Sequence, residues 1–198
     1  MGYMDGNTLL EKKNHPNYIG KKIAIIGGGN VAMDAARTIN KMGAKSVKVI
    51  YRRAEEQMPA EKKEIEDAKK EGIEFLFQTN IKKILGKANV EKIECIKMDL
   101  VQKEGETRLS PVEIPNSNYD MPIDYVVMAI GAKTEQESLE KENIELTQKN
   151  YVKINENYET SIKNVFAGGD LVGNTATIAW AARDGRNAAD KINYILLC

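Results

Sequence analysis

Apolar residues near the start of the chain change their period within one short segment. A β-branched apolar run at 23–26 has the composition of a strand that is buried on both faces. Three glycines follow at 27–29. Beyond them apolar residues recur at helical spacing, at Val31, Ala35, Ile39 and Met42. The pattern predicts a parallel-type strand that passes through a glycine turn into a helix, which Gly43 ends.

The glycine turn has the spacing of a dinucleotide-binding motif. Gly27, Gly29 and Ala32 spell G-x-G-x-x-A, in which the first glycine permits the turn and the second admits a pyrophosphate. The helix N-terminus would add unpaired N–H groups and the positive end of its dipole. An ordinary glycine-rich turn is the competing interpretation, but the strand before it and the helix after it favour a nucleotide. The candidate pyrophosphate-binding residues are Gly27, Gly28, Gly29, Asn30 and Val31.

A second strand at 46–51 completes the βαβ unit, and Arg52 and Arg53 follow directly. NAD-binding units usually carry an acidic residue here for the ribose hydroxyl, whereas a 2′-phosphate requires cations. A solvated loop would explain the arginines too, but guanidinium groups fit phosphate well. The two arginines therefore favour NADP(H).

The pattern after Arg53 alternates between helix and strand and then becomes continuously β. We expect a surface helix that begins at 58–60, a third strand at 73–77 and a β-meander over 81–109. Prolines at 111, 115 and 122 indicate an irregular excursion. A buried strand then runs from 123 to 131. Its end should approach the same nucleotide, through Ala129, Ile130 and Gly131.

The last third of the chain is polar before it becomes apolar again. It contains a strand-like piece at 151–154 and a second strand-to-glycine turn at 164–170. An alanine-rich stretch from 175 onward predicts a closely packed helix. Asp170 at the junction has the position of a residue that accepts hydrogen bonds from turn or helix N–H groups.

These elements together predict an α/β fold: a Rossmann-like parallel sheet with a β-meander crossover, in three layers. We expect residues 1–20 to be a leader or linker and residues 21–134 to form the nucleotide-binding domain. Residues 135–198 would be a separate C-terminal segment.

Composition excludes several classes of function. Lys and Arg together number 29, as do Asp and Glu, so no net charge favours nucleic acid or an anionic membrane. No apolar run is long enough to cross a bilayer, and the polar N-terminus lacks a signal-peptide core, so we expect a cytoplasmic protein. Two cysteines and one histidine, without metal-ligand spacing, predict no metal site.

Four stretches together resemble one known family. They are IAIIGGGNVAMDAARTINKMGA, VIYRRAEEQMPA, AKKEGIEFLF and NVFAGGDLVG. In this order they are similar to the NADPH-dependent glutamate synthase small chain and the related flavin subunits of ferredoxin:NADP oxidoreductases. The resemblance begins at about Lys12. It implies a flavoprotein in which an NADPH domain interrupts an FAD domain, and it implies that Gly169 and Asp170 contact FAD.

The resemblance also implies a function and partners. NADPH would hand a hydride to FAD, so the protein need only position the two rings, and we nominate no catalytic residue. The family's N-terminal half, with its FAD glycine motif and iron–sulfur cysteines, is absent from this sequence. We therefore expect partners that supply the FAD half and an iron–sulfur or large catalytic subunit, or a homodimer through the C-terminal helix. The alternative is a stand-alone NADP(H)-binding or interaction module without turnover.

Overall fold

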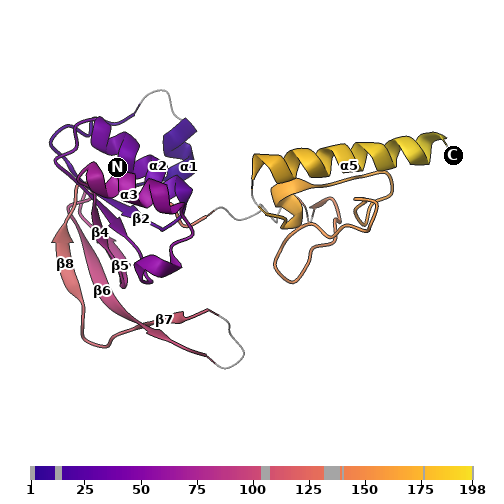
Figure 1. Ribbon diagram of the computed structural model, residues 1–198. Coiled ribbons are helices and arrows are strands. Elements are labelled where there is room, and N and C mark those ends of the chain that lie inside the picture. Colours follow the sequence, from indigo (N-terminus) through magenta and orange to yellow (C-terminus); the bar gives the residue numbers. More distant parts are fainter. Residues whose placement is uncertain are drawn as a thin grey trace. The chain divides into compact units, whose positions relative to one another are not determined.

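The chain forms two compact units, 1–131 and 132–198 (Figure 1). The computed structural model describes residues 3–11, 15–103, 108–131, 139, 141–175 and 177–197. The boundary expected after residue 134 lies outside these ranges. We describe each unit by itself.

A five-stranded parallel sheet forms the centre of the first unit. Its order is β1-β9-β2-β3-β4, and every neighbouring pair is parallel. The strands are β1 (Tyr3–Asp5), β2 (Lys22–Ile26), β3 (Ser46–Ile50), β4 (Glu74–Leu76) and β9 (Tyr125–Met128). The central strands β2, β3 and β9 are the most apolar, as buried parallel strands should be. The predicted Rossmann-like sheet is confirmed.

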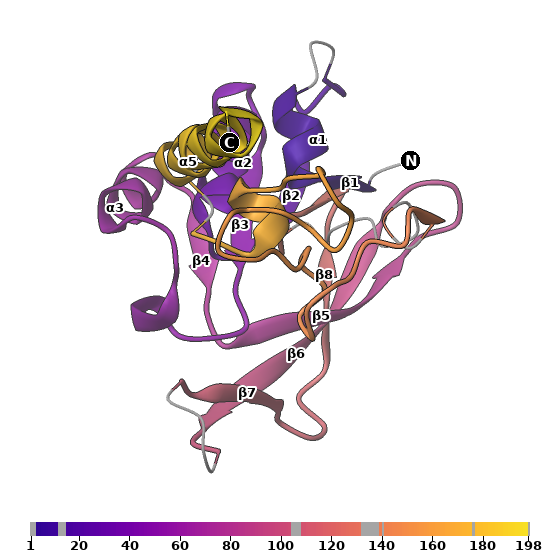
Figure 2. The same ribbon diagram turned by 90° about the vertical axis from the view of Figure 1, so that its right-hand side faces the viewer.

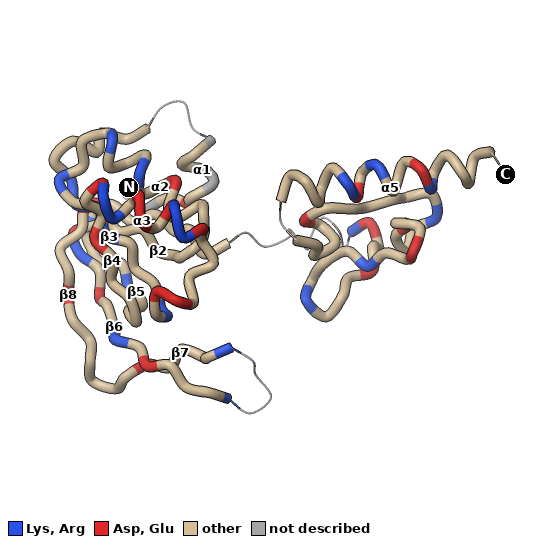
Figure 3. The backbone as a smooth tube through the Cα atoms, in the orientation of Figure 1, with Lys and Arg blue, Asp and Glu red and all other residues tan. Residues whose placement is uncertain are grey.

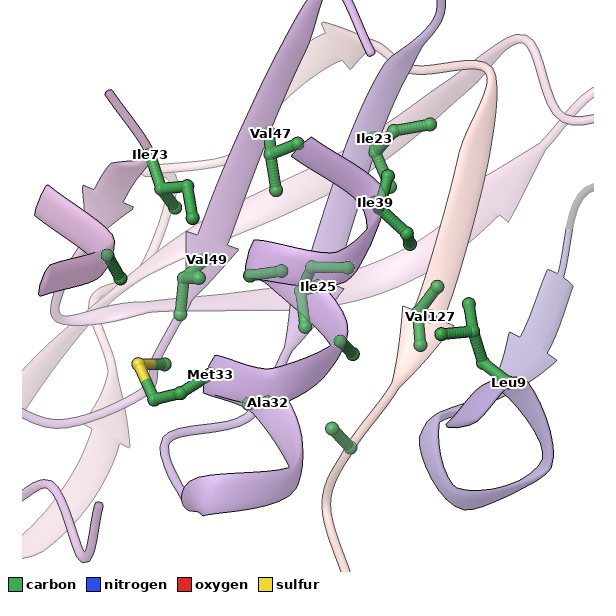
Figure 4. Packing of buried hydrophobic residues seen from close by; sticks show 14 of the residues in the cluster. Leu9, Ile23, Ile25, Ala32, Met33, Ile39, Val47, Val49, Ile73 and Val127 are labelled. Atoms are coloured by element: carbon green, nitrogen blue, oxygen red, sulfur yellow. The ribbon is translucent and has the colours of Figure 1, made fainter. Parts of the chain in front are cut away.

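Three helices cover one face of this sheet: α1 (Gly6–Glu11), α2 (Asn30–Lys41) and α3 (Lys62–Lys70). Ile25 and Val49 project from the strands towards α2, which carries Met33 and Ile39, and Val127 lies nearer to α1 (Figure 4). All five side chains are at most 1% exposed. Burial of each large side chain contributes about 1.5–3 kcal/mol, so α2 is held mainly by this face.

An antiparallel sheet covers the opposite face. It contains β5 (Thr79–Leu85), β6 (Lys92–Val101), β7 (Ser110–Glu113) and β8 (Tyr119–Pro122), and β6 pairs with the other three. Ala24 and Ile26 alternate with Ile23 and Ile25 along β2, so they face Ile93 of this second sheet. Figures 1 and 2 show the β6–β7 hairpin extending away from the parallel sheet. The predicted three layers and β-meander are confirmed.

The expectation of a leader at 1–20 was wrong. Residues 3–5 form β1, which pairs with β9 from Tyr3↔Val126 to Asp5↔Met128. The following helix α1 packs beside α2 and buries Leu9 completely. The strand is too short to show a period, and its partner lies more than a hundred residues away, so no local pattern indicated it.

The predicted helix start at 58–60 was also wrong. A 3-10 turn, η1 (Glu55–Gln57), comes first, and α3 begins only at Lys62. The backbone between them is tied to the glycine turn instead. Ala60 N donates to the Gly28 carbonyl at 3.1 Å, and Glu61 N donates to Asn30 Oδ1 at 3.0 Å.

The proline-rich excursion at 111–122 contains two strands, β7 and β8, rather than irregular chain. Pro111 lies opposite Leu100 in β7, and Pro122 is the last residue of β8. Both strands lie at the margins of the second sheet, where a missing N–H donor costs little.

The second unit is built around α5 (Ile178–Leu197) and a 3-10 turn, η2 (Gly169–Val172). The strand expected at 151–154 and the strand expected within the strand-to-glycine turn at 164–170 are reduced to the single bridges Leu146↔Val152 and Glu159↔Phe166. The predicted close packing of α5 was wrong, because Ile178 is 91% exposed and Asp184 is its one fully buried residue among those described. Basic and acidic residues are interspersed in both units (Figure 3). In the described ranges, no helix combines the length and apolar character needed to cross a membrane.

Candidate functional site

A pocket of about 620 Å³ opens at the carboxyl ends of β2, β3 and β9 in the first unit. Its volume falls within the range of small-molecule and cofactor sites. Open parallel sheets bind ligands beyond their carboxyl edge, and this pocket lies there. The glycine turn forms one wall, and the loop after β3 forms another.

Gly27 and Gly28 are required by the fold itself. Gly27 has a φ of +143°, and a Cβ there would lie 2.2 Å from the Ala129 carbonyl oxygen. A Cβ on Gly28 would lie 2.6 Å from the ring of Tyr51. These two glycines let the turn pass between β9 and Tyr51.

Gly29 differs from its neighbours because nothing in the protein fills the space beside it. A Cβ there would meet only Pro59 Cγ, at 4.0 Å. Its backbone is extended, with φ −95° and ψ 178°, a conformation that any residue adopts. The space that its missing side chain leaves belongs to the pocket, so the structure contains a cradle that a Cβ would fill.

The N-terminus of α2 points its first amides towards this turn. Ala32 N and Met33 N both donate to the Gly29 carbonyl, and the amides of Asn30 and Val31 precede this first turn of hydrogen bonds. Neither Asn30 nor Val31 lines the pocket with its side chain. The Asn30 side chain accepts from Glu61 N, and Val31 packs against Gly6. Any role of these two residues is therefore through their backbone.

Three arginines line the pocket: Arg52 and Arg53 from the loop after β3, and Arg108 from the hairpin between β6 and β7. Arg53 Nε donates to the Leu109 carbonyl at 3.2 Å. Within the described ranges, no carboxylate pairs with any of these guanidinium groups, and the pocket lining contains no Asp or Glu. The wall is therefore strongly cationic.

Tyr51 connects the glycine turn to Arg108. Its ring lies against Gly28, and its hydroxyl donates to the Gln57 carbonyl at 2.8 Å. Arg108 Nη2 donates to the same carbonyl at 2.5 Å and to the Tyr51 hydroxyl at 3.3 Å. The hydrogen bonds fix the loop that carries Arg52 and Arg53 against the hairpin.

The end of β9 forms the opposite side of the pocket. Ala129, Ile130 and Gly131 all line it, as their position after a parallel strand predicts. Ala129 N donates to the Ile26 carbonyl at 2.7 Å, which continues the sheet to its edge. Ile130 is 68% exposed, so it offers an apolar surface at this side of the pocket.

Cys95 takes no part in the pocket. It is fully buried in β6, and burial raises the pKa of its thiol to about 11, so it remains protonated and unreactive. Among the described residues, no group of His, Cys, Asp and Glu side chains could hold a metal ion.

In the second unit, Gly169 and Asp170 occupy the turn that begins η2. Gly169 has a φ of +67°, and its N–H donates to Asp184 Oδ2 at 3.0 Å. The Asn174 amide donates to the same oxygen at 2.5 Å, and these hydrogen bonds lower the pKa of the Asp184 carboxyl. The Asp170 side chain is exposed. The residue that accepts the turn's N–H group is therefore Asp184, and not Asp170.

Eight of the sixteen described residues that line the pocket were predicted from the sequence, and the cation Arg108 was not. Gly27, Gly28, Gly29, Arg52, Arg53 and residues 129–131 all line one cavity, whereas Gly169 and Asp170 lie in the other unit. Arg108 was missed because it lies far along the chain in a polar hairpin. Only the pairing of β6 with β5 and β7 brings it to the carboxyl edge of the sheet.

Comparison with known proteins places this geometry in a family. The model of the pyridine nucleotide-disulphide oxidoreductase family matches residues 2–185. The NADP(+)-dependent formate dehydrogenase subunit beta of Moorella thermoacetica is 35% identical over 98% of this chain, which spans 28% of that relative. The glutamate synthase [NADPH] small chain of Halomonas elongata is 35% identical over 87% of this chain and 38% of its own length. Both relatives are named as parts of larger enzymes.

Solved structures agree in fold. Thioredoxin reductase of T. acidophilum superposes with a TM-score of 0.75 at 22% identity, over 100% of this chain and 58% of its own. FprA of Mycobacterium tuberculosis, solved in complex with NADPH, gives a TM-score of 0.73 at 18% identity, over 91% of this chain and 54% of its own. The family match covers the glycine turn, the arginine pair and the second unit as far as residue 185. The chain belongs to the pyridine nucleotide-disulphide oxidoreductase family of enzymes.

Proposed function

We propose that residues 1–131 bind NADPH and present its nicotinamide for hydride transfer to FAD. One observation carries this proposal: a helix N-terminus and an open glycine cradle share a cavity with two arginines at the end of β3. The helix N-terminus and the glycine cradle suit a pyrophosphate, and the two arginines suit a 2′-phosphate. The absence of acidic side chains from the described lining disfavours NAD(H), whose ribose hydroxyls are usually held by a carboxylate.

The sheet order suggests how the nucleotide lies. β2 runs between β9 and β3, so a pyrophosphate at Gly29 divides the pocket into two halves. The adenosine half would extend towards β3, where Arg52 and Arg53 would hold the 2′-phosphate. The nicotinamide half would extend towards β9, where Ile130 offers an exposed apolar surface. Ala129 and Gly131 would line the same half.

The chain's residues would bind and orient the nucleotide rather than supply an acid or a base. Hydride transfer between NADPH and FAD requires the two rings to be positioned, and the cofactors supply the chemistry. The described lining contains no Asp, Glu, His or Cys that could act on a proton. This composition is consistent with positioning alone.

We propose that the second unit contributes Gly169 and Asp170 to the FAD site. Asp184 holds the turn at Gly169, and the exposed Asp170 carboxylate is free to accept hydrogen bonds from the ribityl chain. The remainder of the FAD site, with its own glycine motif, would come from polypeptide outside these 198 residues. The lengths support this, because the chain spans 28% and 38% of the two relatives described above.

We propose that this FAD-binding part covers the apolar residues of α5. Ile178 at the start of α5 and Leu196 and Leu197 at its end are 91%, 76% and 84% exposed. A second copy of the chain is the other occupant. Sedimentation velocity distinguishes them: a monomer favours the FAD-binding part, and a stable dimer favours self-association through α5. An iron–sulfur or large catalytic subunit would receive the electrons.

Titration of the purified chain with NADPH and NADH, followed by calorimetry, tests the binding proposal. We expect NADPH to bind at least about tenfold more tightly, because each charge-assisted hydrogen bond to the 2′-phosphate contributes about 1.5–3 kcal/mol. Equal affinity for the two nucleotides would contradict the assignment of Arg52 and Arg53.

A further inference from the structure

Arg108 lies on the hairpin between β6 and β7, and it lines the same cavity as Arg52 and Arg53. The hairpin belongs to the antiparallel sheet, so it reaches the nucleotide pocket from a different layer of the domain. No feature of the glycine turn or of the loop after β3 requires a cation on this hairpin. Its presence there needs a separate explanation.

Two neighbouring residues fix the hairpin to the loop after β3. The Leu109 carbonyl accepts from Arg53 Nε at 3.2 Å, and Arg108 Nη2 donates to the Gln57 carbonyl at 2.5 Å and to the Tyr51 hydroxyl at 3.3 Å. Both acceptors of Arg108 are neutral. These contacts orient the Arg108 guanidinium, none of the described residues compensates its charge, and the hairpin is held against the loop that carries Arg53.

The resulting cluster favours a dianion. Three arginines line one cavity, and none has a carboxylate partner among the described residues. Like charges that share a wall repel one another unless an anion lies between them. Each guanidinium has five N–H donors, and the contacts of Arg108 with the described residues use only Nη2. Nε and Nη1 make no hydrogen bond to those residues and could donate to a phosphate, with which guanidinium forms paired hydrogen bonds.

The position of Arg108 identifies which phosphate it would meet. The pyrophosphate belongs at Gly29 and the N-terminus of α2. Arg108 is separated from that turn by the ring of Tyr51, which lies against Gly28. Its other anchor, Gln57, belongs to the loop that follows Arg53. Arg108 therefore lies on the adenosine side of the pocket.

We propose that Arg108 is a third cation of the adenosine 2′-phosphate site and that it helps set the preference for the phosphorylated nucleotide. This inference rests on the proposed binding of NADPH to residues 1–131. It assigns a role to the β6–β7 hairpin: the second sheet contributes part of the specificity of a pocket that the parallel sheet builds.

Two nucleotide fragments, 2′,5′-ADP and 5′-AMP, isolate the 2′-phosphate in calorimetric titrations of the whole chain. Arg108→Gln keeps a polar side chain and removes the charge. We expect it to lower the affinity for 2′,5′-ADP about tenfold, which is about 1.4 kcal/mol, and to leave 5′-AMP unchanged. Arg108→Lys keeps the charge but loses the paired donors, so it should retain only part of the affinity and lie between the parent and Arg108→Gln. Lys97→Gln, which removes an exposed β6 cation that does not line the pocket, is the matched control and should change neither ligand.

The outcomes separate this inference from the proposed function. Unchanged binding of 2′,5′-ADP to Arg108→Gln, while Arg52→Ala weakens it, would overturn the role of Arg108 alone. An equal loss of both fragments would also overturn it, because Arg108 would then only brace the loop. If the unaltered chain binds 2′,5′-ADP no better than 5′-AMP, the proposed NADPH site itself fails. Thermal melting of each variant verifies that it is folded.

Discussion

Substitution of Gly29 separates the nucleotide-binding role of the glycine turn from its structural role. Serine is the most informative replacement, because it fits both the backbone and the helix. The Gly29 backbone is extended, and an added Cβ would approach nothing closer than Pro59 Cγ at 4.0 Å. Serine is also a slightly better N-cap for α2 than glycine. The substitution should therefore leave the folded domain undisturbed.

Gly29→Ser should raise the stability of the fold and lower the affinity for NADPH. Loss of glycine's freedom in the unfolded chain stabilises by about 0.4–1 kcal/mol, and the improved cap adds a few tenths. In a protein of this size that raises Tm by about 2–4 °C. Binding should fall about a hundredfold, because displacement of the pyrophosphate removes two charge-assisted N–H bonds of about 1.5 kcal/mol each.

The neighbouring glycines provide the contrast. Gly27→Ala would place a Cβ 2.2 Å from the Ala129 carbonyl oxygen at a positive φ, and Gly28→Ala would place one 2.6 Å from the Tyr51 ring. Both should lower Tm, by an amount that corresponds to about 1–3 kcal/mol of overpacking or more. Thermal melting and calorimetry with NADPH measure the whole series. A folded Gly29→Ser protein that binds NADPH as tightly as the parent would refute the proposal that the pyrophosphate occupies the space beside Gly29.

Three further predictions concern other residues. Arg52→Ala should weaken NADPH binding about tenfold to a hundredfold and leave NADH binding nearly unchanged in calorimetry, and equal losses would contradict it. Cys95 should resist iodoacetamide at pH 8, as measured by peptide mass spectrometry, and the free energy of unfolding should decline as the pH rises from 9.0 to about 11, because the unfolded thiol ionises first. Arg37 lowers the pKa of Glu71 below 4.5 through paired hydrogen bonds, so this contact stabilises the fold above pH 4.5 and is lost as the pH falls below that value. Arg37→Met should flatten that acid-induced decline in urea melts, and an unchanged decline would show that the pair contributes nothing.

The parallel sheet and its glycine turn could be predicted because their signals are local. One continuous segment contains the apolar run at 23–26, the three glycines and the apolar spacing of α2. The three signals indicate the same strand-turn-helix structure. The same holds for β3 and for Arg52 and Arg53. Gly43 adopts a φ of +87° after α2, as a C-terminal glycine should.

The missed elements are those that depend on distant parts of the chain. β1 is a strand only because β9 pairs with it, and Pro111 is tolerated only because β7 lies at a sheet margin. Pro59 resembles a helix start, yet the hydrogen bond from Ala60 to Gly28 holds that segment against the pocket. No local sequence pattern indicated Arg108, because it lines the pocket only through the position of the β6–β7 hairpin.

The most direct test of the central claim is the ionisation of the 2′-phosphate of NADPH in the complex. Its ³¹P resonance can be followed against pH, free and with the chain in excess. A phosphate monoester loses its second proton near a pKa of about 6, and cations within hydrogen-bonding distance lower such a pKa by about 1–3 units. We predict that the bound 2′-phosphate titrates at least about one unit below the free nucleotide. A 2′-phosphate that titrates identically in the free and the bound nucleotide would contradict its contact with Arg52 and Arg53.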